Sequence, residues 1–360
     1  MQWNWQKKGW GNFTYDEAIL KSATGDFLNG LGECVGILKH STDDTKNIFK
    51  VELMRDEALT TSFIEGEILD RDSVQSSICN QFGIKSNNHN VPDREFGISS
   101  IMFDLYENYV TCLTEEKLCE WHNLLFTGNL RIKGGQYRNT DAPMQIVSGA
   151  HGKAKIHFEA PPPNMIVTEM QNFLAWFNRT PDISPIIKAG IAHLYFECIH
   201  PFEDGNGRIG RAIIEKAISQ NIGQPSLLMI SYTINQNKKA YYKALEQANK
   251  SNEITEWLIY FTDLIKQAQK NTIQRIDFII KKTKLYDTVK NTLNPRQQKV
   301  LARILEEGID GFKGGLSAEN YQSITKASSA TATRDLKDMV EKGVLIKNGE
   351  LRYTRYYLNI

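Results

Sequence analysis

The sequence predicts a mainly α-helical protein with one β-hairpin near its centre and a winged helix-turn-helix at its C-terminal end. Three observations support this fold class. Apolar residues recur at helical spacing over most of the chain up to residue 285. Two short β-prone runs, 145–147 and 155–158, bracket a turn that contains glycine. From residue 294 onward, three short helical segments precede two strand-like segments, which is the order of a winged helix.

Length and composition indicate several modules of ordinary globular character. A single core usually stops growing at about 250 to 300 residues, and this chain has 360. Charged residues make up 24%, hydrophobic residues 41%, and the net charge is +1, so no global field favours nucleic acid or a membrane. We expect an N-terminal helical region over 1–95, a helical core over 96–285 and a winged helix-turn-helix over 286–360.

The ends and the cysteines point to the cytoplasm. The N-terminus lacks the apolar core of a signal peptide, and no run approaches about 18 apolar residues, so we expect neither export nor a membrane span. The five cysteines are scattered, without a Cys-x-x-Cys pair. That pattern disfavours structural zinc and a disulfide framework.

The helical segments follow one another with polar or glycine-rich breaks between them. A polar break at 85–93 separates the first helical region from the second. The periodicity predicts helices within 15–77 and 98–126, and at 165–178, 185–199, 208–220, 238–284, 295–308, 317–325 and 329–341. Strands are expected at 342–346 and 353–358 as the wing.

The irregular stretch 127–163 interrupts the helical core. It is rich in glycine and ends in three consecutive prolines, and it contains the expected hairpin around Ser148–Gly152. A long non-helical insert in a helical protein is typical of a functional loop.

The most informative segment is 189–211. Its first half is apolar at almost every position and predicts a buried central helix, interrupted by His193, Glu197 and His200 at spacing i, i+4 and i+7 on one face. Pro201 then ends the helix because its ring cannot continue the hydrogen-bond ladder.

The loop after Pro201 has the chemistry of a phosphate cradle. Its glycines and asparagine permit unusual backbone angles, so that peptide N–H groups converge before the next helix begins. Arg208 and Arg211 lie three residues apart and can bind one phosphate chain, while Asp204 supplies a carboxylate for magnesium. A histidine at the entrance, His200, suits the removal of a hydroxyl proton. These features predict a site for a triphosphate and Mg²⁺.

The run His200-Pro201-Phe202-Glu203-Asp204-Gly205-Asn206-Gly207-Arg208-Ile209-Gly210-Arg211 resembles the signature HPFx(D/E)GNGRxxR of Fic domains. Every fixed position matches. The resemblance implies a Fic-type helical core whose hairpin serves as a flap, and transfer of AMP from ATP to a Ser, Thr or Tyr hydroxyl of a protein.

The same resemblance implies roles for individual residues. His200 would be the general base, and Asp204 would hold Mg²⁺. Residues expected at the ATP molecule are Asp204, Gly205, Asn206, Gly207, Arg208, Ile209, Gly210 and Arg211 from the motif, Tyr241 and Asn249 at the adenine, and Val147 and Ser148 on the flap. The flap would align an extended target segment by strand addition.

A second, shorter motif lies upstream. Residues Thr61–Gly66 match the inhibitory pattern (S/T)xxxE(G/N) of many Fic proteins. Glu65 would place its carboxylate against Arg211 and occupy the charge that the γ-phosphate of ATP needs. The alternative is that Glu65 is a solvated carboxylate at a helix end beside Glu67.

Other interpretations of these residues remain. Glu197 and His200 have di-iron spacing, but such sites need carboxylates from further helices and a continuous bundle helix. His193 and Glu197 are interpreted as supporting residues of the core. Glu65 could also align a water for the reverse reaction, removal of AMP, and the Fic core could instead sense nucleotide for a DNA-binding regulator.

The winged helix makes DNA a candidate partner. Its recognition helix, expected at 329–341, offers Thr331, Thr333, Arg334 and Lys337 as contacts. Asp335, Asp338 and Glu341 on the same helix weaken a basic footprint, so protein docking or a homodimer contact is the alternative. The expected partners are therefore a protein substrate, including the chain itself, a second copy, and DNA, with no membrane.

Overall fold

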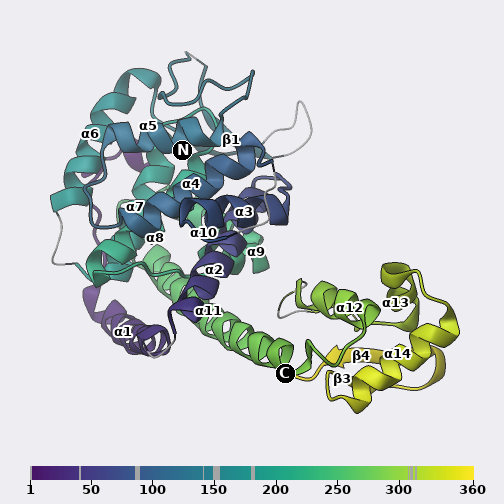
Figure 1. Ribbon diagram of the computed structural model, residues 1–360. Helices are drawn as coiled ribbons and strands as arrows, with labels where there is room; N and C mark the ends of the chain where they lie inside the picture. Colours follow the sequence, from purple (N-terminus) through teal and green to yellow (C-terminus); the bar gives the residue numbers. More distant parts are fainter. Residues whose placement is uncertain are drawn as a thin grey trace. The chain divides into compact units, whose positions relative to one another are not determined.

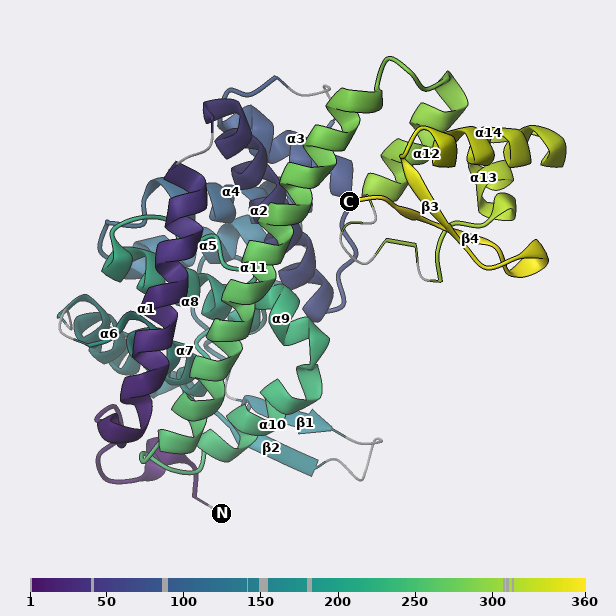
Figure 2. The same ribbon diagram turned by 90° about the horizontal axis from the view of Figure 1, so that it is seen from below.

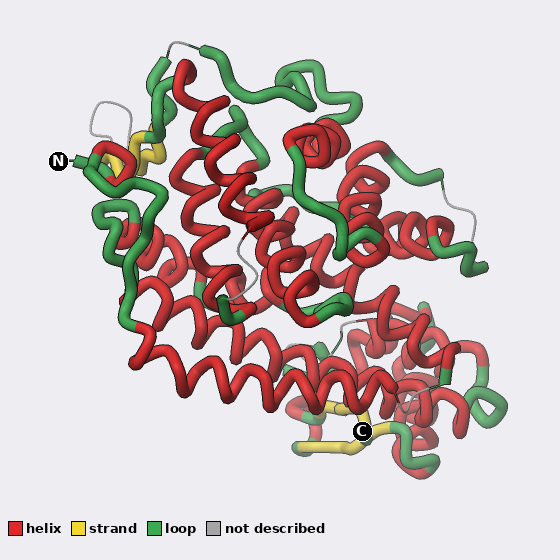
Figure 3. The backbone as a smooth tube through the Cα atoms, turned by 90° about the vertical axis from the view of Figure 1, so that its left-hand side faces the viewer, coloured by secondary structure: helices red, strands yellow, loops and turns green. Residues whose placement is uncertain are grey.

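The computed structural model describes residues 2–39, 42–85, 90–140, 142–148, 155–179, 183–306, 308, 311–312 and 314–360. The chain is mainly helical, as predicted, and its strands are few and short (Figure 1, Figure 3). It divides into two compact units, Met1–Thr272 and Ile273–Ile360, and the division falls within helix α11, Thr255–Val289.

The first unit is a bundle of helices with one hairpin. Its elements before α11 are η1 (Asn4–Gln6), α1 (Glu17–Lys39), α2 (Asp43–Ile64), α3 (Arg71–Gln81), α4 (Asp93–Glu107), α5 (Glu115–Leu125), β1 (Gln145–Ser148), β2 (Lys155–Glu159), α6 (Pro163–Arg179), α7 (Pro185–Ile199), α8 (Asn206–Ile222), α9 (Ile230–Gln236) and α10 (Lys238–Ala248). Among the helices of the described residues, none has the length and apolar character needed to cross a membrane.

Helix α7 forms the centre of this core and packs along α8. Every residue from Ile186 to Ile199 except Glu197 is buried, because this part of the sequence is apolar at almost every position. Burial of apolar surface on this scale is the main favourable contribution to folding. The helix that carries His200 at its end is thus held rigidly from all sides.

The hairpin is antiparallel, with Ile146 opposite Phe158 and Ser148 opposite Lys155. A bulge follows Ile146. The expected turn, Gly149–Gly152, lies outside the described residues. The N-terminal segment fastens the base of the hairpin, because the Trp5 indole donates a hydrogen bond of 2.7 Å to the Glu159 carbonyl.

In the described part of the second unit, the end of α11 is followed by three α-helices and a two-stranded sheet, in the predicted order. Its elements after α11 are α12 (Pro295–Glu306), α13 (Ala318–Thr325), α14 (Ser329–Glu341), β3 (Leu345–Asn348), η2 (Leu351–Tyr353) and β4 (Arg355–Leu358). Both strands begin later than the sequence predicted. Lys342 and Gly343 form the exit from α14, where Gly343 has a φ of 71°, so β3 cannot start before it.

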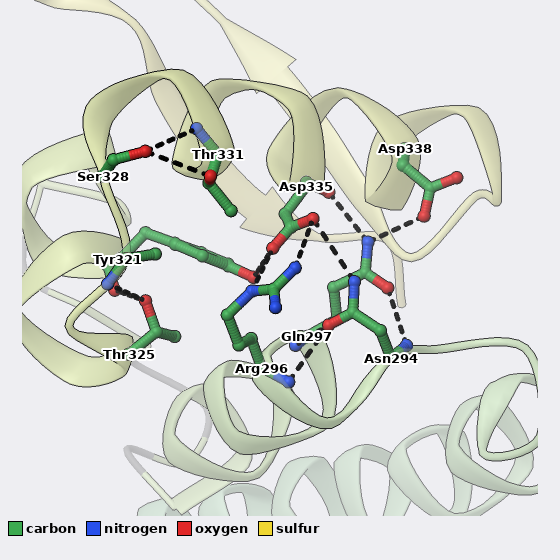
Figure 4. A network of polar contacts seen from close by, with 10 residues as sticks. Asn294, Arg296, Gln297, Tyr321, Thr325, Ser328, Thr331, Asp335 and Asp338 are labelled. Atoms are coloured by element: carbon green, nitrogen blue, oxygen red, sulfur yellow. Dashed lines mark hydrogen bonds and ion pairs between the residues drawn. The ribbon is translucent and has the colours of Figure 1, made fainter.

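A polar network centred on the buried side chain of Asp335 ties α14 to α12 (Figure 4). Asp335 accepts hydrogen bonds of 2.9 Å from both the Tyr321 hydroxyl and Arg296 Nε. Gln297 donates to the Asp335 carbonyl and to the Asp338 carboxylate. Two of the acidic side chains of α14 therefore contact the unit's own residues.

Candidate active site

His200 ends helix α7 in a left-handed conformation. Its φ is 50° and its ψ is 60°, and its N–H still donates to the Phe196 carbonyl at 2.9 Å. Such a conformation costs about 1 to 3 kcal/mol in a residue other than glycine and is common at functional sites. The buried Arg138 stabilises it, since its Nε donates to the His200 carbonyl at 2.8 Å and its backbone N–H donates to the Pro201 carbonyl.

The imidazole of His200 is arranged as a base. Its Nδ1 lies 3.3 Å from the carbonyl oxygen of Glu197, so an N–H at Nδ1 leaves the lone pair at Nε2 free to take a proton. Burial lowers the pKa of His200 to about 4, partly opposed by that hydrogen bond. The ring is therefore neutral at physiological pH, which is the form a base requires.

The loop between α7 and α8 is closed by the side chain of Asn206. The amide donates to the Phe202 carbonyl at 2.8 Å and accepts the Phe202 N–H at 2.9 Å. Gly205, at a φ of 82°, precedes the first residue of α8, and its N–H donates to Asp204 Oδ1 at 2.5 Å. Asn206 thus shapes the loop with its side chain, and α8 begins where the sequence placed the phosphate cradle.

Arg211 is buried against the C-terminal end of α2. Its Nε donates to the Thr61 hydroxyl at 2.7 Å, and its Nη2 donates to the Thr61 carbonyl at 3.0 Å and to Glu65 Oε1 at 2.7 Å. Glu65 directly follows the last residue of α2. The pairing of Glu65 with Arg211 that the sequence predicted is thus present as a direct contact.

Arg208 is held by a second carboxylate that sequence reasoning did not assign. Its Nη1 donates to Glu67 Oε2 at 2.7 Å, and Asp204 Oδ1 lies 3.7 Å from its Nη2. The guanidinium also stacks over the Phe126 ring, with 5.2 Å to the ring centroid. The only sequence signal for this contact was the position of Glu67, two residues after Glu65.

Three further motif residues form the contact surface of α8. Ile209 is buried in the core. A Cβ at Gly207 would collide with Glu65 Oε1, and one at Gly210 would collide with Glu197 Oε1. The two glycines therefore let α2 and α7 approach this turn of α8 closely.

A buried polar group lies behind His200. His193 Nε2 is 2.6 Å from the Tyr241 hydroxyl, and burial lowers the pKa of His193 to about 3. Burial raises the pKa of Glu197 to about 7, although Arg211 opposes this rise. His193 is fully buried, and the interpretation of His193 and Glu197 as supporting residues of the core stays a prediction.

The two predicted adenine contacts are mostly buried. Tyr241 is 2% exposed and contacts His193, whereas the neighbouring Tyr242 is 48% exposed. The Asn249 carbonyl accepts the Asn4 N–H at 2.8 Å. Tyr242 is thus the aromatic side chain that a ligand can reach from outside, and sequence reasoning did not select it.

The hairpin lies beside α10, as Figure 2 shows. Lys155 Nζ and His157 Nδ1 contact the Glu246 carboxylate at 3.0 and 2.9 Å, and Ser148 Oγ lies 2.5 Å from His157 Nε2. Val147 is exposed on the same strand as Ser148. The polar side of the flap is thus tied to α10, while apolar side chains face outward.

The residues present fit a magnesium ion that is held mainly by substrate phosphates. Within the described ranges, no group of three or more His, Cys, Asp or Glu side chains gathers as a metal site. Asp204 is half exposed and keeps one carboxylate oxygen beyond its contact with Gly205. One carboxylate together with nucleotide phosphates is a common way to bind Mg²⁺.

Comparison with known families identifies two regions of the first unit. Residues 112–218 match the Fic/DOC family, and residues 3–84 match a domain of unknown function (DUF4172). The first match contains the whole motif from His200 to Arg211, and it confirms the Fic resemblance that the motif predicted.

Two curated relatives are named protein adenylyltransferases. A probable protein adenylyltransferase of Aquifex aeolicus is 31% identical over 143 residues, which are 40% of this chain and 39% of the relative. Protein adenylyltransferase Fic of Drosophila grimshawi is 28% identical over 142 residues, which are 39% of this chain and 26% of the relative. The alignments therefore span less than half of these relatives.

Solved structures of Fic proteins share the fold. A Fic family protein of Desulfovibrio desulfuricans G20 has a TM-score of 0.52 at 21% identity, and the match covers 93% of this chain and 95% of that protein. Fic-1 of C. elegans has a TM-score of 0.52 at 17% identity, covering 72% of this chain and 75% of that one.

Proposed function

We propose that this chain, whose residues 112–218 form a Fic domain, transfers AMP from ATP to a hydroxyl group of a protein and is restrained by Glu65. The main support for the proposal is the position of His200. Its ring is neutral and rigidly held, and it lies beside the loop that precedes α8, the helix on which the two arginines are buried. That combination supplies a base and an anion site next to each other.

The step balances with these groups. The target hydroxyl oxygen attacks the α-phosphorus of ATP, and its proton passes to His200 Nε2. A new O–P bond forms, the bond between the α-phosphorus and the bridging oxygen breaks, and pyrophosphate leaves. Arg208 and Arg211 would stabilise the charge on the phosphates, and Asp204 would hold Mg²⁺. The ion would neutralise part of the charge on the phosphates.

The proposed restraint on transfer follows from the carboxylates that bind the two arginines. Glu65 bonds to Arg211 and Glu67 bonds to Arg208, both at 2.7 Å. A γ-phosphate that needs Arg211 must therefore displace a carboxylate of the same chain. The resting protein is in this sense a transferase whose phosphate site is filled from within.

Radiolabelled ATP tests the proposal. The protein with Glu65→Gly is incubated with a cell extract, Mg²⁺ and ATP labelled at the α- or the γ-phosphate. We expect α-label on protein, more with Glu65→Gly than with the natural chain, and none when His200→Ala is added. Asp44→Asn, which removes a carboxylate from the exposed start of α2, serves as the matched control and should leave labelling unchanged.

Two outcomes would overturn the proposal. Label from the γ-phosphate alone would indicate a kinase reaction. Loss of activity with Glu65→Gly on a protein that already carries AMP would instead identify the removal reaction, in which Glu65 aligns the water.

We further propose that the second unit contacts double-stranded DNA through α14. The supporting observation is that Asp335 and Asp338 are engaged with α12 (Figure 4), whereas Arg334 and Lys337 are exposed. The outer face of α14 is therefore less acidic than its sequence suggests.

Fluorescence anisotropy with a labelled random-sequence duplex tests this second proposal. Binding should weaken with salt and with Arg334→Ala plus Lys337→Ala, but not with the control Lys281→Ala on α11. Equal binding by all three proteins would rule out α14 as the contact, and the absence of binding at low salt would rule out DNA.

A further inference from the structure

Glu197 places a carboxylate behind the ring of His200. It lies one turn earlier on α7, and its Oε2 is 3.8 Å from His200 Nδ1. Its carbonyl oxygen is the acceptor 3.3 Å from the same nitrogen. Among the described residues, no group donates a hydrogen bond to the buried atom Glu197 Oε1. A buried carboxylate oxygen without a hydrogen-bond partner is costly, which calls for a reason beyond packing.

The transfer step creates a charge that needs a counterion. When His200 accepts the hydroxyl proton it becomes an imidazolium, and its nearest cation, Arg138, disfavours that charge. Glu65 and Asp204 favour it. In the proposed function, however, Glu65 moves away when ATP takes Arg211, and Asp204 is used for Mg²⁺.

Unlike Glu65 and Asp204, Glu197 remains available next to His200 during the proposed transfer. It belongs to the same buried helix as His200, and α8 packs directly against it at Gly210. Neither release of α2 nor binding of a metal ion at Asp204 requires it to move. Its Oε2 lies 3.8 Å from Nδ1, close enough for an attractive charge interaction once the ring is protonated.

We propose that Glu197 is a positioning residue for the transfer reaction: its backbone carbonyl holds His200 in the base orientation, and its carboxylate stabilises the imidazolium that forms during transfer. This inference rests on the proposed function of His200. The arrangement is that of a histidine base with a carboxylate near its second nitrogen, except that here the backbone carbonyl of Glu197 lies at hydrogen-bond distance and the carboxylate lies slightly farther away.

The charge state of Glu197 makes the role measurable. Burial raises its pKa to about 7, so the carboxylate is ionised above neutral pH and protonated below it. His200, whose pKa is about 4, is already neutral over this range. The described ionisable groups that face Glu197 are Glu65 after α2, His193 and Cys198 on α7, His200 at its end, Arg211 on α8, and Tyr241 and Tyr242 on α10. A rate that falls toward acid pH therefore reports Glu197, and the fall should lie at lower pH once Glu65, whose charge raises the pKa of Glu197, is removed.

The pH dependence of kcat tests the inference. In protein with Glu65→Gly, transfer to a fixed protein acceptor is measured between acid and alkaline pH, with and without Glu197→Gln. We expect Glu197→Gln to lower kcat by roughly tenfold or more at alkaline pH, to abolish the fall toward acid pH, and to change KM for ATP little. Asp44→Asn, an equal loss of charge at the exposed start of α2, is the control and should keep the natural profile.

Imidazole NMR separates this inference from the proposed function. The His200 ring signal is assigned by its loss in His200→Ala. In the natural chain its chemical shift should change near pH 7, where the neighbouring Glu197 ionises. With Glu197→Gln this change should be absent, whether or not any transfer occurs. If Glu197→Gln changes neither the pH dependence of kcat nor that of the His200 signal, the inference is wrong. Absence of transfer with an intact titration would instead overturn the proposed function.

Discussion

Replacing Glu65 by Gln should tighten the binding of ATP more than that of ADP. The substitution keeps the size of the side chain but removes the charge that contacts Arg211 at 2.7 Å. A hydrogen bond between charged groups contributes about 1.5 to 3 kcal/mol, and the 28% exposure of the Glu65 side chain favours the lower end. About 1.5 kcal/mol corresponds to roughly a tenfold change in Kd.

Isothermal titration calorimetry with ATP and with ADP measures this effect. We expect Glu65→Gln to lower the Kd for ATP about tenfold. The Kd for ADP should change much less, because ADP lacks the phosphate that competes with Glu65 for Arg211. Asp44→Asn should change neither constant. An equal gain for both nucleotides, or no gain, would refute the competition between Glu65 and the γ-phosphate.

Three further outcomes are expected. Adding Glu67→Gln to Glu65→Gln should tighten ATP binding by a further few-fold in the same calorimetry, and an unchanged Kd would mean that the Glu67 contact does not restrain the site. Asn206→Ala should lower the free energy of unfolding by about 1 to 3 kcal/mol, because it removes both bonds to Phe202, and an unchanged Tm would contradict this. Burial alone would raise the pKa of Asp335, but the hydrogen bonds of its network lower it below the unfolded value. Its contribution to stability is thus complete above about pH 4 and lost as pH falls through the folded pKa. Asp335→Asn should reduce the acid sensitivity of unfolding, and an unaltered dependence on pH would exclude Asp335 as its source.

Local patterns predicted the parts of the site that lie close together in the chain. The apolar run before His200, the proline after it and the glycines of the loop fix a buried helix, its end and the start of α8 without reference to the rest of the fold. The winged-helix elements were likewise predicted in order, although the wing strands begin later because Gly343 must first turn the chain out of α14.

Contacts between distant segments were predicted only where a motif supplied them. The pairing of Glu65 with Arg211 came from a resemblance, and the structure contains it. The contacts of Glu67 with Arg208 and of Arg138 with the His200 carbonyl join residues 141 and 62 positions apart, and no local pattern encodes either. Such pairs depend on how the helices pack.

The sequence also could not show which of two adjacent tyrosines is buried. Tyr241 and Tyr242 both lie on α10, and helical periodicity does not decide which of two neighbouring tyrosines faces the core. The structure buries Tyr241 against His193 and leaves Tyr242 at the surface. The orientation is set by the packing of α10 on α7 through that hydrogen bond, a tertiary contact.

The mass of the modified acceptor shows directly whether the chain transfers AMP. Protein with Glu65→Gly is incubated with ATP, Mg²⁺ and extract, and acceptor peptides are analysed by tandem mass spectrometry beside a reaction with His200→Ala added. We expect hydroxyl side chains that carry one AMP group, absent from the His200→Ala reaction. Peptides that gain only a phosphate, or that gain AMP equally without His200, would contradict it.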